Sequence, residues 1–379
     1  MPTGESKAGA PAAAKGAFRQ VGRAVADLRR GVPVAVLDGG AGCLVVATEL
    51  ADEETIAALE EAGAGRAGIA LSAHRARVLN IAPTGRDAVV LAAPPHLNTA
   101  GLCGLADPMT DLDNPLRGPF EVESDPWPGS TAALTLCKLA RLIPAVLLVR
   151  VPTGSARELA DWAARHDILV VQADDVAAHE KDSALTLRAV TSAQVPLAGA
   201  ENTRLIAFRP ADGGVEHVAI VVGDPDRSQP VLTRLHSECF TGDLLESLRC
   251  DCGQQLRGAI VLMAEQGSGV LIYLAQEGRG IGLINKLRAY RLQDQGFDTV
   301  DANERLGFEA DERIFLPAAQ MLRALGYDRV RLLTNNPEKV EGLERHGIIV
   351  AERVPHAFPP NNHNERYLRT KALRRGHKL

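Results

Sequence analysis

Three cysteines lie close together in the second half of the chain, at Cys239, Cys250 and Cys252. Cys250 and Cys252 are two positions apart, so only a loop or turn lets both side chains face one ion. Cys239 lies eleven positions earlier, across a turn predicted by Thr241-Gly242-Asp243. Three thiolates that leave a fourth position open for water are typical of a catalytic zinc site, where zinc lowers the pKa of that water to about 7. The alternatives are a structural zinc with a distant fourth ligand, and chance clustering.

The composition argues against several classes of protein. Aromatic residues make up 4% and the net charge is −5, which disfavours binding to nucleic acid or to a membrane surface. The segment from Met1 to Gly16 lacks the apolar core of a signal peptide, and no run of about 18 apolar residues predicts a membrane span. Six cysteines in 379 residues are too sparse for a disulfide scaffold. We therefore expect a cytoplasmic protein that binds small molecules, without nucleic-acid or membrane partners.

The chain divides into a flexible tail at 1–18 and two domains at 19–183 and 184–379. Helical and strand patterns alternate in the first domain. The expected helices are 21–30, 50–62, 130–142 and 155–166, and the expected strands are 34–37, 145–151 and 168–172. Seven prolines between Ala93 and Gly129 predict a long irregular segment.

The second domain carries the strong motifs. Its expected strands are 217–222, 269–274 and 330–333, and its expected helices are 254–265, 281–295 and 317–325. A further helix is expected from a cap before Pro337 to Gly347. Strands that alternate with helices predict a mixed or parallel sheet covered by helices, the α/β class. Cys43, Cys103 and Cys137 are far apart, and we expect inert buried thiols there.

Charged residues flank the cysteine trio. Arg234, His236 and Glu238 alternate, so in a strand they would share one face, as substrate contacts or as a solvated strand edge. The run Glu277-Gly278-Arg279-Gly280 follows a buried strand and opens a helix, which is where α/β sheets bind anionic ligands. A simple helix-entry turn would look the same.

Two later groups have weaker signals. Asp311 and Arg313 can face the same side of an extended chain, although taken alone they read as surface charge. Thr334 and Lys339 bracket the start of a helix, a suitable place to hold phosphate oxygens. Lys339 could equally be a solvated helix residue.

The segment from about Ala184 to the C-terminus resembles GTP cyclohydrolase II. The resemblance rests on RLHSECFTGDLLESLRCDCGQQL at 234–256, QEGRGIGLINKLRAYRLQDQGFDTVDAN at 276–303, LGFEADERIF at 306–315 and RLLTNNPEKVEGLERHGI at 331–348. It closes with similar residues in Asn361–Leu368. Several long motifs in the right order and spacing make this resemblance specific. It implies a mixed-sheet α/β domain in the C-terminal half.

The resemblance implies a reaction in which GTP and water give formate, pyrophosphate and 2,5-diamino-6-(5-phosphoribosylamino)pyrimidin-4-one, the first step of riboflavin biosynthesis. Matched by position, Cys239, Cys250 and Cys252 look like ligands of one Zn²⁺ that activates water for attack at C8 of guanine. The residues that match positions holding GTP are Arg234, Leu235, His236, Ser237, Glu238, Gln255, Glu277, Gly278, Arg279, Thr299, Thr334 and Lys339. Mg²⁺ on the triphosphate and a homodimer are expected by the same analogy.

The resemblance also implies catalytic residues. Arg313 matches a proposed nucleophile at the α-phosphate, Asp311 a general acid/base beside it, and Tyr290 a tyrosine near the ring-opening site. An arginine with a pKa above about 12 is a poor nucleophile. Electrostatic stabilisation of the phosphate would also need Arg313. Covalent attack and electrostatic stabilisation therefore both stay open as roles for this residue.

The first half resembles, more distantly, 3,4-dihydroxy-2-butanone 4-phosphate synthase, which implies an α+β domain. The similar segments are 24–31 and 131–151. The family's acidic run after the first strand is replaced by Leu37–Cys43, its His-Thr-Glu segment by Gly129–Ala132, and a later acidic residue by Arg150. Without clustered carboxylates Mg²⁺ has no site, so we expect a degenerate domain without synthase activity.

Three alternatives remain at this stage: an enzyme of both reactions, a non-catalytic GTP-binding scaffold of the flavin pathway, and a cyclohydrolase that stops at a formylated intermediate. The missing acidic cluster argues against the first. The complete set of Cys239, Cys250, Cys252, Asp311 and Arg313 argues against the second. Tyr290 argues against the third.

Overall fold

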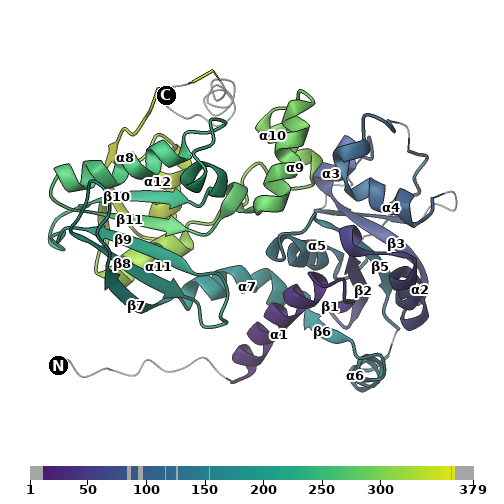
Figure 1. The fold of residues 1–379 in the computed structure, drawn as a ribbon. Coiled ribbons are helices and arrows are strands. Elements are labelled where there is room, and N and C mark those ends of the chain that lie inside the picture. Colours follow the sequence, from purple (N-terminus) through teal and green to yellow (C-terminus); the bar gives the residue numbers. More distant parts are fainter. Residues whose placement is uncertain are drawn as a thin grey trace. The chain divides into compact units, whose positions relative to one another are not determined.

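The computed structural model describes residues 12–82, 87–92, 97–115, 117–124, 127–152, 154–359 and 361–362. The chain forms two compact units that divide between Glu180 and Lys181, inside helix α7 (Ala173–Leu185) (Figure 1). Most of the expected closing motif at Asn361–Leu368 lies outside the described residues. Within the described part, every helix is too short or too polar to cross a bilayer.

The first unit contains a mixed six-stranded sheet. Its strands are β1 (Val34–Asp38), β2 (Ala41–Ala47), β3 (Ala64–Ser72), β4 (Ala88–Ala92), β5 (Ala145–Arg150) and β6 (Leu169–Gln172), in the order β4-β3-β5-β2-β1-β6. Only the β1–β6 pair is parallel among these neighbours. Gly39 and Gly40, both with positive φ, form the tight turn between β1 and β2.

Helices cover both faces of this sheet. They are α1 (Ala12–Leu28), α2 (Glu53–Ala62), α3 (Ala73–Val78), α4 (Thr99–Ala106), α5 (Ser130–Leu139) and α6 (Ala156–Arg165). Alternate strand residues point to opposite sides, so Val34 and Val36 pack in one core with α1 and α5. Ala35 and Leu37 pack in the other core, with α2, α3, α4 and α6.

Two expectations for this half need correction. Helix α1 begins at Ala12, so residues 12–18 of the expected tail are helical, in keeping with the high helix propensity of the alanines at its start. The proline-rich segment between Ala93 and Gly129 contains α4 and a 3₁₀ turn at Pro108–Thr110. Asn98 caps α4 by accepting from the Gly101 amide at 2.9 Å, so a short capped helix forms between the prolines.

The second unit contains a mixed seven-stranded sheet. Its strands are β7 (Arg188–Gln194), β8 (Thr203–Arg209), β9 (His217–Val222), β10 (Val231–Ser237), β11 (Gly269–Leu274), β12 (Arg329–Leu333) and β13 (Ile349–Val354), in the order β13-β12-β10-β11-β9-β8-β7. The strands β13, β12, β10 and β11 run parallel, and β9, β8 and β7 complete the sheet as antiparallel neighbours. The expected mixed-sheet α/β class is confirmed for this unit. The first unit, with a mostly antiparallel sheet and covering helices, fits the α+β domain expected there.

The helices of the second unit are α8 (Cys252–Glu265), α9 (Leu283–Asp294), α10 (Thr299–Arg305), α11 (Leu316–Leu325) and α12 (Pro337–Arg345). Helices α11 and α12 pack on one face of the sheet and α8 packs on the other. Leu235 faces the α11–α12 side, whereas Leu232 faces α8. Helix α8 begins at Cys252 itself, two residues earlier than expected.

Candidate active site

The polar residues of the second unit gather where three parallel strands end. Cys239 follows β10, Glu277 opens the 3₁₀ turn Glu277–Gly280 after β11, and Thr334 follows β12. Because β10 runs parallel to both β11 and β12, these carboxyl ends meet at one edge of the sheet. The crevice outside such strand ends is the usual ligand site of open α/β sheets.

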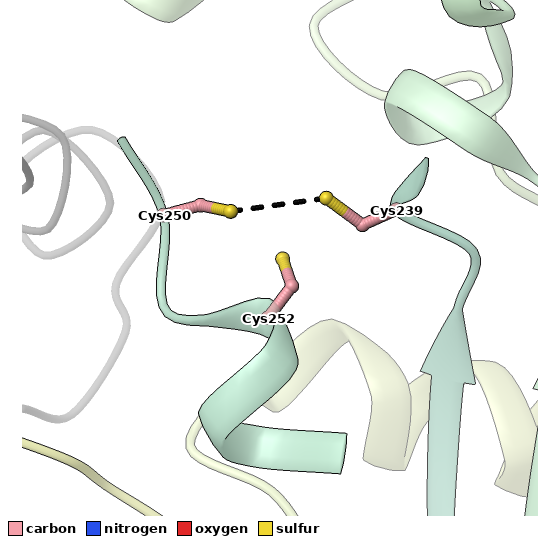
Figure 2. A group of neighbouring side chains, drawn as sticks. All are labelled: Cys239, Cys250 and Cys252. Carbon is pink, nitrogen blue, oxygen red and sulfur yellow. Dashed lines mark hydrogen bonds between the residues drawn. The ribbon is translucent and has the colours of Figure 1, made fainter. Parts of the chain in front are cut away.

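The three cysteines converge at this edge. Figure 2 shows Cys239 on the chain that leaves β10, Cys250 on a loop, and Cys252 in the first turn of α8, with their sulfur atoms pointing toward one another. The Sγ atoms of Cys239 and Cys250 are 3.8 Å apart, and all three Sγ atoms lie within 4.8 Å of one another. This distance is far longer than the roughly 2.05 Å of a disulfide bond. The start of α8 also favours negative charge on Cys252, because the helix dipole is positive there.

The spacing of the sulfur atoms fits a tetrahedral metal ion. Thiolates bound about 2.3 Å from a tetrahedral zinc lie about 3.8 Å from each other. Among the residues that the structure describes, this trio is the one group of three or more His, Cys, Asp or Glu side chains whose ligand atoms are this close. The thiol donors also suit zinc better than they suit magnesium or calcium.

A glycine makes room for the trio. Gly242 lies in a single π-helical turn, Phe240–Leu244. A Cβ atom at this position would lie 2.8 Å from Cys250 Sγ, 2.9 Å from Cys252 Cβ and 3.0 Å from Cys239 Sγ. The three cysteines therefore close around a backbone that tolerates no side chain.

A carboxylate fixes the same turn. Asp243 accepts hydrogen bonds from the Cys239 amide at 3.0 Å and from the Tyr273 hydroxyl at 2.9 Å. Its two carboxylate oxygens also lie 3.0 and 3.2 Å from Nε2 of His236, whose ring stacks on Tyr273. Burial lowers the pKa of His236. Asp243 thus ties the first cysteine to a histidine of the cavity wall.

One cavity contains most of the expected site residues. It is lined by Arg234, His236, Ser237, Glu238, Cys239, Arg249, Cys250, Cys252, Gln255, Glu277, Gly278, Arg279, Ile281, Lys286, Ala289, Tyr290, Gln293, Thr299, Asn303, Arg313, Thr334, Asn335, Asn336, Lys339 and His356. Arg234 and His236 share one face of β10, and Ser237 lies on the other face. All three line the cavity, because the strand ends at Ser237 and its side chains no longer alternate between the faces of a sheet beyond that point. Two expected residues do not line it. The Leu235 side chain is in the core, and Asp311 contacts the cavity residue Arg313.

Lys286 connects the cysteines to the 3₁₀ turn. It lies on α9, and its Nζ donates to Cys239 Sγ at 3.1 Å, to Thr241 Oγ1 at 2.9 Å and to Glu277 Oε1 at 2.9 Å. Glu277 is 3% exposed, and its other oxygen accepts from the Phe240 amide at 2.6 Å. Burial lowers the pKa of Lys286, but the hydrogen bond to Glu277 and nearby negative groups outweigh burial and raise it. Lys286 is therefore a buried, fixed cation.

Arg313 and Asp311 form a bidentate ion pair. Arg313 Nε donates to Asp311 Oδ1 at 2.8 Å and its Nη2 donates to Oδ2 at 2.6 Å. A third nitrogen donates to Ser237 Oγ at 3.4 Å. Burial alone would raise the pKa of Asp311, but the Arg313 guanidinium lowers it to about 2. Asp311 is thus ionised at neutral pH and holds the guanidinium plane in one orientation.

Arg234 is a second buried guanidinium, 4% exposed. It donates to the Leu333 carbonyl at 2.9 Å and to the Gln255 side chain, while its Nε has no hydrogen-bond partner among the described residues. Burial lowers its pKa to about 10, which leaves it charged at neutral pH. His356 lies 2.8 Å from the Gln255 carbonyl, and burial lowers the pKa of this histidine to about 4.

The 3₁₀ turn has an unusual backbone. Gly278 and Arg279 both have φ of 64°, in the left-handed region. Such a conformation is common for glycine and uncommon for arginine. The Arg279 carbonyl accepts from the Glu312 amide at 3.0 Å, and its side chain donates to the Ala310 carbonyl at 3.3 Å. These contacts hold Arg279 at the cavity wall.

The β12 end and helices α9 and α10 complete the cavity. The Thr334 hydroxyl accepts from the Asn336 amide at 3.0 Å, and Lys339 Nζ donates to the Leu235 carbonyl at 2.6 Å. Tyr290 lies on α9, with Arg249 Cζ 5.1 Å from its ring centre. Thr299 opens α10, and Gln293 donates to its hydroxyl at 3.5 Å.

Comparison with known proteins identifies the family. The protein-family model of GTP cyclohydrolase II matches residues 188–355 of this chain. The GTP cyclohydrolase-2 of Azospirillum brasilense is 55% identical over 366 residues, which cover 95% of this chain and 94% of that protein. The chain belongs to the GTP cyclohydrolase II family. The GTP cyclohydrolase-2 of Citrobacter koseri is 53% identical over 195 residues, which cover 52% of this chain and 99% of that protein.

A solved structure is similar over both halves. RibBX, a two-domain 3,4-dihydroxy-2-butanone 4-phosphate synthase from A. baumannii, is 17% identical, with a TM-score of 0.33. The similarity covers 89% of this chain and 99% of that chain.

Several cavity residues were not expected from the sequence of this GTP cyclohydrolase II family member. They are Arg249, Ile281, Lys286, Ala289, Gln293, Asn303, Asn335, Asn336 and His356. Asn335 and Asn336 could have been inferred from the helix start that they share with Thr334. The sequence did not indicate Lys286 as a site residue, because a lysine inside a helix is usually solvated.

Proposed function

We propose that this protein hydrolyses GTP to 2,5-diamino-6-(5-phosphoribosylamino)pyrimidin-4-one, formate and pyrophosphate, the first step of riboflavin biosynthesis. The observation that carries the proposal is one cavity in which three converging cysteines stand beside several fixed cations, among them Arg234, Arg279, Arg313 and Lys339. A thiolate metal site serves ring hydrolysis, and the cations serve a triphosphate. GTP is an intracellular nucleotide, which favours the cytoplasm as the protein's location.

Cys239, Cys250 and Cys252 would hold the zinc ion. When bound, zinc supplies a Lewis acid that makes water nucleophilic at neutral pH, the chemistry needed at C8 of guanine. The residues around the trio limit its movement: Asp243 anchors the Cys239 backbone, and Gly242 lets the three sulfur atoms approach. Tyr290, on the cavity wall, is proposed to act at the opened ring.

The cations of the cavity would bind the phosphates. Arg313 presents a guanidinium plane already oriented by Asp311, so it can stabilise charge on the α-phosphate with little reorganisation. Its high proton affinity favours this electrostatic role over covalent attack. The low pKa of Asp311 favours an orienting carboxylate or a base over a general acid at neutral pH. Mg²⁺ would enter with the triphosphate, as part of the substrate.

We also propose that the second unit forms a homodimer. Large apolar side chains are exposed near the trio, with Leu244, Leu245 and Leu248 at 67%, 61% and 59% exposure. Ile284 and Leu287 on α9 are 65% and 51% exposed. Apolar surface of this kind is usually covered by a partner. Analytical sedimentation of the unmodified protein and of the Leu245→Glu variant tests this. A dimer that is unchanged in the variant would show that these exposed side chains do not form the dimer interface.

The first unit is proposed to be a degenerate synthase domain whose retained role is structural or regulatory. The acidic run expected after a first strand is replaced by the Gly39–Gly40 turn, and Arg150 lies with its Cζ 4.4 Å from the Trp127 ring centre. Incubation with ribulose 5-phosphate and Mg²⁺ should yield no 3,4-dihydroxy-2-butanone 4-phosphate. Formation of that product would restore the alternative of an enzyme for both reactions.

The main test is to incubate zinc-loaded protein with GTP and Mg²⁺ and to quantify formate and pyrophosphate together. Equal amounts of both support the full reaction. Pyrophosphate without formate would indicate a stalled ring opening and would overturn the complete reaction. Neither product, with zinc bound, would favour the scaffold alternative.

A further inference from the structure

The ammonium of Lys286 contacts a cysteine sulfur directly. Lys286 is 8% exposed, and its Nζ lies 3.1 Å from Cys239 Sγ. The remaining hydrogen bonds of this nitrogen go to Thr241 Oγ1 and Glu277 Oε1, both at 2.9 Å. An ammonium has three N–H donors. All three therefore have acceptors, and one of them is a sulfur of the trio.

The charges of the site need such a cation. Three thiolates and a divalent ion carry a net charge of −1, and the buried Glu277 adds another negative charge beside them. Buried charges without a counter-charge are costly. Lys286 lies between the two negative groups and hydrogen-bonds to both.

The lysine is held in place from two sides. Glu277 accepts from Lys286 with one oxygen and from the amide of Phe240, the residue after Cys239, with the other. Within this pair, Glu277 therefore binds the backbone next to Cys239, and Lys286 binds the sulfur of Cys239. The Tyr290 ring is a further neighbour of the ammonium, with its centre 5.7 Å from Nζ.

We propose that Lys286 is a positioning residue of the metal centre: its charge, donated to the Cys239 sulfur, sets the affinity of the trio for zinc and the electron density that Cys239 gives to the metal. This inference rests on the proposed zinc site. It differs from a purely structural role, in which Lys286 would only pin α9 to the Phe240–Leu244 turn through Thr241.

The test compares three variants of the full chain. Lys286→Met removes the charge and keeps the length, and Lys286→Arg keeps the charge. Thr241→Val is the control for a neutral contact, because it removes a hydroxyl that lies 2.9 Å from the lysine and 3.7 Å from Cys239 Sγ. Zinc affinity is measured by competition with a chelator at fixed neutral pH. The protein is also loaded with cobalt(II), whose thiolate charge-transfer absorption reports on the metal–sulfur bonds.

We expect Lys286→Met to weaken zinc binding by about 10- to 100-fold, as the loss of a group that supports a metal ligand does. The cobalt charge-transfer band should shift in the same variant, because Cys239 then donates more electron density. Lys286→Arg should recover most of the affinity. Thr241→Val should resemble the unmodified protein in both measurements.

Two results would overturn the inference while leaving the proposed function intact: unchanged zinc affinity and cobalt spectrum in Lys286→Met, or a Thr241→Val loss as large as that of Lys286→Met. If Lys286→Met does not fold, Lys286→Gln replaces it as the uncharged variant. Equal zinc affinities of Lys286→Gln and Lys286→Arg would then overturn the inference, and weaker binding by Lys286→Gln would support it. If the unmodified protein binds no zinc, the proposed function itself fails and this inference fails with it.

Discussion

The two units build similar sheets and end their strands differently. Both sheets have apolar strands with helices on each face. In the first unit, β1 turns directly into β2 through Gly39 and Gly40. In the second unit, β10 and β11 end in segments that carry Cys239 and Glu277. A covered sheet therefore supplies only the scaffold, while the residues after the strand ends supply the chemistry.

The strongest test of this difference is Cys250→Ser. We expect this variant to lose zinc and formate release while the fold remains, because a hydroxyl is a poor replacement for a thiolate at a zinc ion. Metal content and formate are measured on the same sample. Cys103→Ser, in the first unit, is the matched control and should keep both. Formate release by a zinc-free Cys250→Ser protein would break the proposed mechanism.

The next test uses glycines. Gly242→Ala should weaken zinc binding by about 10-fold or more, because the new Cβ would collide with all three cysteines. Gly22→Ala, in α1, is the control, since a Cβ there meets nothing within 4 Å. Chelator competition measures both variants. Equal zinc affinity in the two variants would contradict the close packing of the three cysteines around Gly242.

Asp311→Asn tests the Asp311–Arg313 pair, which is proposed to lie at the phosphates of the substrate. The pKa of Asp311 is lowered from 3.8 to about 2, so its ionisation contributes about 2 kcal/mol to the free energy of unfolding at pH 7. Because the folded-state pKa is the lower one, this contribution is present above pH 3.8 and disappears as pH falls toward about 2. Urea denaturation across this range should show the variant's deficit shrinking with acid. A deficit that grows with acid would contradict the pairing.

Formate release by Asp311→Asn should also fall, by about 100-fold, because Arg313 loses its fixed orientation. The stability and activity losses have one cause but are measured separately. Unchanged activity alongside lowered stability would limit Asp311 to a structural role.

The smallest effect is expected in the first unit. Arg150→Ala removes the contact with Trp127 and should lower the free energy of unfolding by about 0.5–1 kcal/mol. Formate release should stay unchanged, since Arg150 belongs to a unit without a proposed catalytic role. A large activity loss would show that the first unit influences the reaction.

Much of the fold follows from sequence patterns. Strands β9 and β11 begin and end where expected, because each is a bounded apolar run. Helix α4 was missed because it has only eight residues and lies among prolines. Strand β7 was missed because it is exposed along its whole length, so no apolar alternation marks it.

The candidate site was predictable where residue type carries chemistry. The cysteine trio converges as its spacing indicates. The contacts of Asp243 and Lys286 were not predictable, because both depend on segments that are distant in sequence and meet only in the folded sheet. Leu235 matched a position that holds GTP, yet its side chain is buried in the core and its carbonyl is what reaches Lys339.

The left-handed backbone at Arg279 has a consequence for protein engineering. A residue other than glycine in this conformation costs about 1–2 kcal/mol. A screen for thermal stability would therefore favour glycine at position 279, and would discard a guanidinium of the cavity wall. Any effort to make this protein more heat-resistant should hold position 279 fixed and seek its gains elsewhere.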